Sequence, residues 1–326
     1  MNMPLHSRLT LILLLIATWH GSFSLFASGA EPEPEIVRVM SFNIWVGGES
    51  GKQPLEQTVA VIKAAEADIV GLQETLGHAP QGEPRPDRVG EIAQQLGWHY
   101  VAQGSGRAVI SRFKIVATTP NRWGALLKLP SGRQLYHFNA HFAASPYQPY
   151  QLLNIPYGDA PFIKTESEAI QAAQAARGHQ VEQMLTEVKA VLPKGFPVFI
   201  TGDFNEPSHL DWTPAAEKAN LCPLAVQWPA TNAVQAAGFR DAYRAVHPDP
   251  TQHRGLTWTP ITAIDSPRDR HDRIDFVFAG GTPLNIKAAS IIGESPDFAD
   301  IIVTPYPSDH RAVVAEVELP TAGSAQ

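Results

Sequence analysis

The segment Thr201-Gly202-Asp203-Phe204-Asn205-Glu206-Pro207 determines how the rest of the chain is interpreted. It follows the apolar run Phe196 to Ile200, which is typical of a buried strand that ends in a turn. Side chains alternate along extended backbone, so Asp203 and Asn205 can point in the same direction. Taken alone, a structural turn explains the segment equally well. Four other predicted strands also end in such a polar residue, and this recurrence favours a chemical role.

Composition limits the number of domains and the classes of function. The chain has 326 residues, of which 44% are hydrophobic, and no Gly/Ser-rich or charged linker divides it, so we expect one large domain. The net charge of −7 argues against tight, non-specific binding to nucleic acid, because such proteins usually carry a basic surplus. With Cys222 as the one cysteine, no disulfide within the chain is possible.

The first thirty residues have the pattern of a secretory signal peptide. Arg8 precedes the apolar run Leu9 to Ala17, and Ser28-Gly29-Ala30 offers small residues for cleavage. A membrane anchor, the alternative, would need a longer apolar run. We therefore expect a signal peptide at residues 1–30, a single catalytic domain at 31–326 without a transmembrane segment, and a secreted or periplasmic protein.

Short strands among a few helices predict an α+β sandwich rather than alternating βαβ units. The helices are expected at residues 54–65, at 88–96 and from Thr165 to Leu192, where Thr165 and Glu168 match a capping box. The strands are expected at 36–43, 67–74, 108–111, 125–129, 134–139, 196–200, 256–260, 273–278, 286–292 and 312–319.

Residues Ser145 to Lys164 are rich in tyrosine and proline and show no clear periodicity. A long irregular segment of this kind is usually functional or disordered. We interpret it as a wall or lid of the substrate site. The alternative is an aromatic plug that covers the edge of the sandwich.

The side chains at the strand ends favour a hard divalent cation. Carboxylate and amide oxygens without thiols suit Mg²⁺ or Mn²⁺ rather than a closed zinc site. The sequence has no His-Glu-x-x-His motif, no Gly-x-Ser-x-Gly elbow and no phosphate-binding Gly-Lys-Ser/Thr loop, which argues against a zinc hydrolase, a serine hydrolase and an NTPase. The groups to be explained are Asn43, Glu74, His141, Asp203, Asn205, Asp275, Asp309 and His310.

Six short motifs in this order resemble those of the endonuclease/exonuclease/phosphatase superfamily, whose relatives include deoxyribonuclease I. They are Ser41-Phe42-Asn43, Leu72-Gln73-Glu74, Asn139-Ala140-His141, Gly202-Asp203-Phe204-Asn205, Arg273-Ile274-Asp275 and Ser308-Asp309-His310. One such motif is unspecific, whereas six in order are specific. The resemblance implies a secreted bacterial-type member with a four-layer α/β/β/α sandwich, in which two packed mixed sheets are flanked by helices and the site lies at one edge.

The resemblance also implies roles for the metal and the attacking water. Glu74, with Asn43 and Asp309, would hold Mg²⁺ or Mn²⁺ against a phosphate oxygen. Asp203 would activate the water for in-line attack, and Asn205 would fix the phosphate or that water. Asn43 could instead be a strand-end turn residue.

The other roles concern the phosphoryl group and the substrate. His310, held by Asp275, would hydrogen-bond the phosphoryl group, and His141 would donate to the phosphate or leaving group. Asp275 interrupts an apolar strand, which is costly unless the carboxylate is paired. Trp258, Arg107 and Tyr147 are the candidates for substrate contact.

The motifs predict a reaction and leave the substrate open. The first interpretation is a phosphodiesterase acting on nucleic acid, phospholipid head groups or small esters, with no stable protein partner implied. The second is a phosphomonoesterase for sugar, nucleotide or inositol phosphates. The third is a non-catalytic extracellular binding module that uses the aromatic loops. The segment Arg268 to Arg273 could reach substrate phosphates or form an exposed, self-neutralising cluster.

Overall fold

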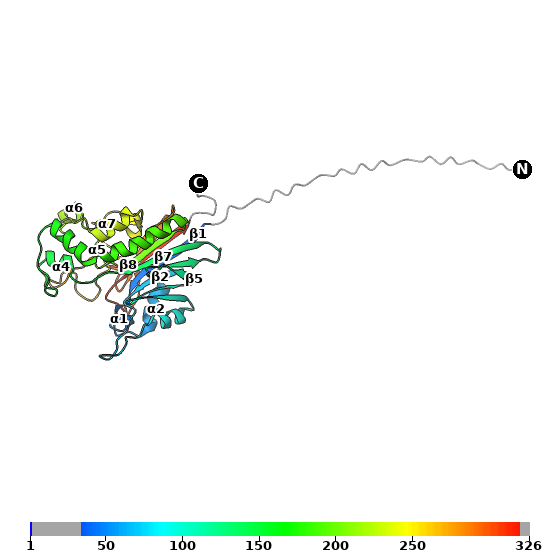
Figure 1. The fold of residues 1–326 in the computed structure, drawn as a ribbon, viewed down its shortest axis with the longest axis horizontal. Coiled ribbons are helices and arrows are strands. Elements are labelled where there is room, and N and C mark those ends of the chain that lie inside the picture. The colour runs from blue at the N-terminus through cyan, green and yellow to red at the C-terminus, as the bar shows by residue number, and fades with distance from the viewer. Residues whose placement is uncertain (2–33, 320–326) are drawn as a thin grey trace. The chain divides into compact units, whose positions relative to one another are not determined.

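A computed structural model of the protein describes Met1 and residues 34–319 (Figure 1). The chain divides into two units, Met1–Glu33 and Pro34–Gln326. Apart from Met1, the predicted signal peptide at residues 1–30 lies outside the described residues. No helix within residues 34–319 is both long and apolar enough to cross a bilayer.

The first sheet has seven strands and mixed pairing. The central strand β1 (Glu35–Asn43) pairs in parallel with β2 (Ile69–Gln73) and antiparallel with β13 (Ala312–Leu319), so the first and last described strands lie side by side. The full strand order is β12 (Ile301–Ile302), β11 (Asn285–Gly293), β13, β1, β2, β4 (Arg107–Ser111) and β3 (His99–Gly104).

The second sheet has six strands and is also mixed. Its order is β5 (Lys114–Thr118), β6 (Gly124–Lys128), β7 (Gln134–His141), β8 (Val198–Asp203), β10 (Asp275–Gly280) and β9 (Arg240–Asp241). β7 and β8 are parallel, and their register places His141 opposite Asp203. β8 and β10 are antiparallel, and their register places Asp203 opposite Asp275. Three predicted site residues therefore meet where β7 and β8 end and β10 begins.

The two sheets pack face to face, with helices on both outer faces. One buried cluster contains Val39 and Val109 from the first sheet and Phe199 and Val277 from the second. The first sheet is covered by α2 (Leu55–Ala64) and α3 (Val89–Leu96), and the second by α5 (Glu166–Val191) and α7 (Pro229–Ala236), as Figure 1 shows. This arrangement confirms the predicted four-layer sandwich.

A polar link between the two sheets lies next to the site. Asn139 on β7 donates to the Leu72 carbonyl at 2.9 Å and accepts from Gln73 Nε2 at 2.6 Å, and both partners belong to β2. A Cβ atom at Gly71 would lie 2.5 Å from Asn139 Oδ1 and 2.1 Å from Thr201 Oγ1, so only glycine allows this approach. Asn139 therefore fixes how the strand ends face one another across the sheets.

The remaining described helices are short and irregularly placed. In the aromatic segment Ser145–Lys164, predicted to be irregular, residues Gln148–Leu152 form α4, which begins with Pro149 in its first turn. Trp212 and Trp228 pack against the first half of α5 in one buried cluster. The others are α1 (Trp45–Gly48), the 3₁₀ helix η1 (Leu192–Lys194), α6 (Pro214–Lys218) and α8 (Ala242–Val246).

The structure corrects two strand predictions and adds strands that were not predicted, β3 and β5 among them. Asp275 is the first residue of β10 rather than an interior residue, so it belongs to the sheet edge. Residues 256–260 form no strand, and Trp258 makes only isolated bridges to Asp272 and His310. β3 and β5 were not predicted because their apolar runs, Tyr100-Val101-Ala102 and Ile115-Val116-Ala117, are only three residues long.

The capping box of α5 is confirmed and gives a first testable prediction. Glu168 N donates to Thr165 Oγ1, and Thr165 N donates to the Glu168 carboxylate at 2.9 Å. Replacing Thr165 with Ala removes this cap and is expected to lower the free energy of unfolding by about 1 kcal/mol in urea titrations. Ser167→Ala, an exposed change in the same turn, is the control and should cost less than about 0.5 kcal/mol. Equal stability of both variants would contradict a role for the cap.

Candidate active site

The strand ends open into a cavity of about 270 Å³ at one edge of the sandwich. The cavity lies where β1, β2, β7 and β8 end and β10 begins. Of the predicted site residues, Asn43 and Asp275 lie behind this lining, and those that line it are Glu74, His141, Tyr147, Asp203, Asn205, Trp258, Asp309 and His310.

Asp203 is the centre of the site. Its Oδ2 atom accepts from Asn43 Nδ2 at 3.0 Å and lies 3.6 Å from His141 Nε2 and 3.7 Å from His310 Nε2. Its Oδ1 atom accepts from the backbone N–H of Asn205 at 2.8 Å, and Asn205 has a positive φ of 50°. The surrounding contacts thus fix the carboxylate in one orientation, with one oxygen between two imidazoles.

His310 and Asp275 form a buried carboxylate–imidazole pair. His310 Nδ1 lies 2.9 Å from Asp275 Oδ2, which leaves Nε2 directed toward Asp203. Burial disfavours the imidazolium, but the carboxylates of Asp275 and Asp203 outweigh burial and raise the pKa of His310 to about 10. Burial also disfavours the charged form of Asp275, which raises its pKa, and the charge of His310 opposes that rise. The His310 ring is therefore a cation at neutral pH.

Two residues outside the predicted set hold His310 in place. Ser308 Oγ donates to the Asn43 carbonyl at 2.6 Å and accepts from the His310 backbone N–H at 3.1 Å. Thr257 Oγ1 accepts from the Asp275 backbone N–H at 3.1 Å. Ser308 could have been found, because it begins the motif Ser308-Asp309-His310, whereas Thr257 has no local signal.

Glu74 and Asp309 provide the oxygens that a cation would need. Glu74 has a positive φ of 56°, and its carboxylate accepts from Val46 N at 3.0 Å and from Asn43 Nδ2 at 3.3 Å. Asp309 Oδ1 is buried and has no hydrogen-bond partner among residues 34–319. Burial, together with the nearby charge of Glu74, raises the pKa of Asp309 to about 7. Two neighbouring carboxylates that line one cavity, one of them with an unsatisfied oxygen, fit a hard divalent cation.

A second group of potential ligands lies beside this pair. One atom each of Asp203, Asp275 and His310 lie within 4.8 Å of one another. His310 already bonds Asp275 through Nδ1. The three residues can therefore serve as a carboxylate–imidazole pair beside Asp203 or as ligands of a metal ion. Enzymes of the superfamily that the motifs resemble use divalent metals, and either group offers a place for one.

Aromatic side chains form one wall of the cavity. Trp45, Tyr150 and Tyr157 line it together with Tyr147 and Trp258. Trp45 was missed because it lies beyond the end of β1, at the start of α1, and belongs to none of the six motifs.

Arg107 and the Arg268–Arg273 segment do not line the cavity. Arg107 on β4 is buried outside the cavity lining, and its guanidinium lies 4.1 Å from the centre of the Trp123 ring. The structure supports neither alternative for Arg268–Arg273 in full: no residue of the segment lines the cavity, and the exposed cluster is wrong because His271, Asp272 and Arg273 are buried. The ion pair inside the segment joins Arg270 to Asp272 at 3.2 Å. Arg273 is buried and bonds Asp211 at 2.9 Å and Asp241 at 2.7 Å.

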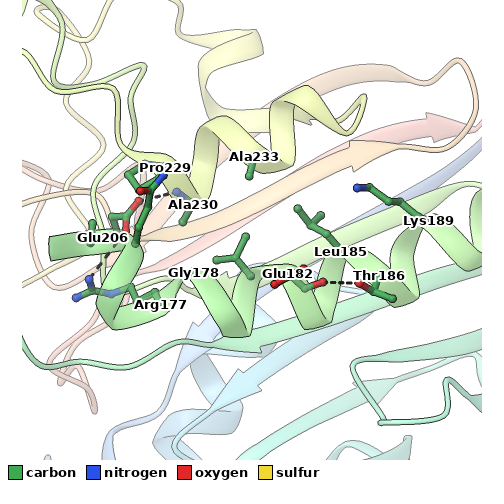
Figure 2. A pocket seen from close by; sticks show the side chains of 13 residues that line it. Arg177, Gly178, Glu182, Leu185, Thr186, Lys189, Glu206, Pro229, Ala230 and Ala233 are labelled. Atoms are coloured by element: carbon green, nitrogen blue, oxygen red, sulfur yellow. Dashed lines mark hydrogen bonds and ion pairs between the residues drawn. The ribbon is translucent and has the colours of Figure 1, made fainter. Parts of the chain in front are cut away.

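A buried ion pair connects the Asn205 turn to the aromatic segment (Figure 2). Glu206 Oε1 accepts from Ala230 N at 2.7 Å, and Glu206 Oε2 lies 3.9 Å from Arg177 Nη1. Arg177 also donates to Gln148 Oε1 at 2.6 Å and to the Pro146 carbonyl at 2.8 Å. Figure 2 shows the pair at one end of a cavity of about 340 Å³ between α5 and α7. Arg177 thus has a structural role in the core and anchors α4.

The buried Glu206 carboxyl is expected to make the stability of the protein depend on pH. Burial raises its pKa from 4.5 to about 7, although Arg177 and the Ala230 N–H oppose the rise. The folded state therefore holds this proton more tightly than the unfolded state. The stabilisation that comes from binding this proton is fully present below pH 4.5 and is lost as the pH rises through about 7. Between those pH values, wild type should lose on the order of 3 kcal/mol of unfolding free energy relative to Glu206→Gln.

Urea titrations of both proteins from pH 4.5 to 8 measure this difference. Glu182→Gln, an exposed change on α5 beside the same cavity, is the matched control and should follow the wild-type curve. Parallel curves for wild type and Glu206→Gln would contradict the buried titration.

Comparison with known proteins agrees with this geometry. A model of the Endonuclease/Exonuclease/phosphatase family matches residues 40–310. The chain is 26% identical over 329 residues to the uncharacterized protein F14F9.5 of Caenorhabditis elegans, covering 94% of this chain and 98% of that protein. It is 25% identical over 247 residues to an inositol phosphosphingolipids phospholipase C of Schizosaccharomyces pombe, covering 68% of this chain and 49% of that protein.

A solved structure shows the same fold. The endonuclease/exonuclease/phosphatase from Beutenbergia cavernae DSM 12333 superposes with a TM-score of 0.55 at 18% identity, over 87% of this chain and 72% of that one. The family match extends from β1 to His310 and includes all six motifs. The chain therefore belongs to the endonuclease/exonuclease/phosphatase family and is a hydrolase acting on phosphoester bonds.

Proposed function

We propose that this protein is a divalent-metal-dependent phosphodiesterase in which Asp203 activates the attacking water. The observation that carries the proposal is the position of Asp203 Oδ2 between His141 Nε2 at 3.6 Å and His310 Nε2 at 3.7 Å. A water near this oxygen would also lie near two groups that can hydrogen-bond a phosphoryl oxygen.

Asp203 acts as the general base. Asn43 and the Asn205 N–H use one lone pair on each carboxylate oxygen and hold the group still. The free lone pairs accept the proton of the water while its oxygen attacks phosphorus opposite the leaving oxygen. Asn205, whose side chain donates to the Phe142 carbonyl at 3.1 Å, fixes the turn that carries the base.

His310 stabilises the charge that develops on the phosphoryl group. Because Asp275 keeps the ring protonated, Nε2–H is a charged donor rather than a base. His141, half-buried at the end of β7, faces Asp203 from the other side and is placed to donate to the leaving oxygen. Loss of either imidazole should reduce turnover more than substrate affinity.

The metal would bind at Glu74 and Asp309, with Asn43 orienting the Glu74 carboxylate. A divalent cation there, Mg²⁺ or Mn²⁺, would polarise a phosphate oxygen and neutralise charge that builds up during attack. The unsatisfied Asp309 Oδ1 atom supports this assignment, since a buried carboxylate oxygen without a donor is costly unless a cation lies beside it.

The composition of the cavity favours a diester over a monoester. None of the described residues that line it is Lys or Arg. A phosphate monoester is largely dianionic at neutral pH and binds best among fixed cations, whereas a diester carries one charge. The Schizosaccharomyces pombe relative is named as a phospholipase C for inositol phosphosphingolipids, which supports diester chemistry. This chain spans about half the length of that protein.

We also propose that the mature protein is secreted or periplasmic. The proposal is supported by the N-terminal pattern of Arg8, the apolar run Leu9 to Ala17 and the small residues Ser28-Gly29-Ala30. N-terminal sequencing of the protein recovered from the culture medium or periplasm should begin near Glu31.

Parallel assays with bis(p-nitrophenyl) phosphate and p-nitrophenyl phosphate, in Mg²⁺ or Mn²⁺, test the proposed reaction. We expect faster hydrolysis of the diester. A preference for the monoester would replace the proposal with a phosphomonoesterase. Failure to hydrolyse either ester, with the fold intact by circular dichroism, would favour a binding module.

A further inference from the structure

Four arginines surround a second, much smaller cavity outside the active site. Its volume is about 20 Å³, which has room for one occupant about the size of a water molecule. The charged residues that line it are Arg244, Arg254, Arg270, Arg273, Asp211 and Asp272. None of these six residues lines the active-site cavity.

Two of the arginines are neutralised by two carboxylates. Arg273 bonds Asp211 at 2.9 Å and Asp241 at 2.7 Å. Arg244 bonds Asp211 from the other side, at 2.5 Å. Each oxygen of these two carboxylates already accepts at least one hydrogen bond. This half of the cluster is therefore electrically neutral and has no carboxylate oxygen left for another cation.

The third carboxylate, Asp272, is shared by three donors. Its Oδ1 atom accepts from Arg270 Nε at 3.2 Å and from Trp212 Nε1 at 3.0 Å, and its Oδ2 atom accepts from the Tyr147 hydroxyl at 2.9 Å. Arg270 Nη2 donates to the Leu221 carbonyl. Arg270 is therefore paired, but its Nη1 atom has no acceptor among residues 34–319.

The guanidinium of Arg254 is left over. Arg254 is half-buried, and its side chain makes no hydrogen bond or ion pair within residues 34–319. Burial and the neighbouring charge of Arg270 lower the pKa of Arg254, and the charge of Asp272 opposes that change. On its other side Arg254 lines a cavity of about 280 Å³ with Asp297 and Asp300. Both are exposed, and neither forms an ion pair with it in the part of the chain that the structure describes.

The cluster thus holds four guanidinium groups against three carboxylates, and one positive charge is unmatched. A partly buried charge without a partner is costly. A water molecule in the cavity would accept a hydrogen bond from Arg254 but would leave the charge unmatched. A monovalent anion of similar size would accept the same hydrogen bond and neutralise the charge. Phosphate and sulfate are too large for a cavity that holds one water molecule.

We propose that the small cavity between Arg254 and Arg270 binds a single chloride ion. The inference goes beyond the proposed function and does not depend on it. The larger cavity beside Arg254 shares that residue and Leu256 with the small one, which gives the ion a route from solvent.

The ion would stabilise the segment that lies behind the aromatic wall of the active site. Asp272 accepts from the Tyr147 hydroxyl, and its backbone exchanges two hydrogen bonds of 3.0 Å with the backbone of Trp258. Tyr147 and Trp258 both line the active-site cavity. Neutralising the arginines beside Asp272 would therefore hold these two residues in place.

Urea unfolding in sodium chloride and in sodium gluconate, at equal ionic strength, tests the site, because gluconate is too large to enter the cavity. Replacing gluconate with chloride should lower the unfolding equilibrium constant of the wild type about tenfold more than that of Arg254→Gln. This is the effect expected when the chloride concentration is about ten times Kd. Arg268→Gln removes the same charge from an exposed position, is the matched control and should respond as the wild type does. Equal responses of wild type and Arg254→Gln would overturn the inference, since general salt effects act on both.

Bromide locates the ion directly in the wild-type protein. It has the charge of chloride and nearly its size, and it gives an anomalous diffraction signal. Crystals soaked in sodium bromide should show an anomalous peak between the guanidinium groups of Arg254 and Arg270. Density at this position without an anomalous signal would identify a water molecule and overturn the inference, as would bromide bound only elsewhere. Neither experiment requires turnover, so each outcome is independent of whether the protein hydrolyses a phosphodiester.

Discussion

Replacing Asp203 with Asn is expected to lower kcat for bis(p-nitrophenyl) phosphate by on the order of 10² to 10⁴-fold. The amide keeps the size of the carboxylate, and its one oxygen can still accept from either Asn43 Nδ2 or the Asn205 N–H, so the fold should survive. It cannot accept the proton of the attacking water. Steady-state kinetics measure the loss, and KM should change far less than kcat.

Asp265→Asn is the control for this substitution. Asp265 is exposed, and the change removes one carboxylate without touching the cavity. It should retain wild-type kcat. If Asp203→Asn kept more than about a tenth of the wild-type rate, Asp203 would not be the general base.

Replacing Arg273 with Met is expected to cost about 3 to 5 kcal/mol of unfolding free energy. Arg273 is buried, and its guanidinium bonds Asp211 at 2.9 and 3.0 Å and Asp241 at 2.7 and 3.1 Å. Methionine fills the space but leaves both carboxylates without this donor. The two charges would then be buried with less compensation, which is the costly case for an ion pair.

Urea unfolding at pH 7 measures the loss, with Arg268→Met as the matched control. Arg268 is exposed, lies in the same segment and loses the same charge, so its substitution should change stability by less than about 0.5 kcal/mol. A small effect at Arg273 would show that Asp211 is satisfied by Arg244 alone, which bonds it at 2.5 Å.

The sequence was most informative where a strand ends in a polar residue. A buried strand such as Val198–Asp203 begins as an apolar run, and the polar residues that follow the run mark the end of the strand. Asn43, Glu74, His141 and Asp203 were therefore recognisable as a group before their distances were known. The role of each residue in catalysis stays a prediction until activity is measured.

Other parts of the site have no signal along the chain. The positive φ of Glu74 depends on tertiary contacts, since glutamate normally avoids that region, whereas asparagine, as at Asn205, adopts it more readily. The burial of Arg273 depends on Asp211, 62 residues away in the chain, and α4 depends on Arg177 holding Gln148. Strands β3 and β5 are the outer strands of their sheets, where few residues are buried. Their sequences therefore show only a weak alternation of apolar and polar residues.

The most direct test of the central claim is hydrolysis of bis(p-nitrophenyl) phosphate by the protein after chelation with EDTA and again after Mg²⁺ or Mn²⁺ is returned. We predict that chelation abolishes turnover, that the metal restores it in wild type, and that restoration requires a higher metal concentration in Asp309→Asn. Undiminished hydrolysis in excess EDTA would contradict the proposed metal-dependent mechanism.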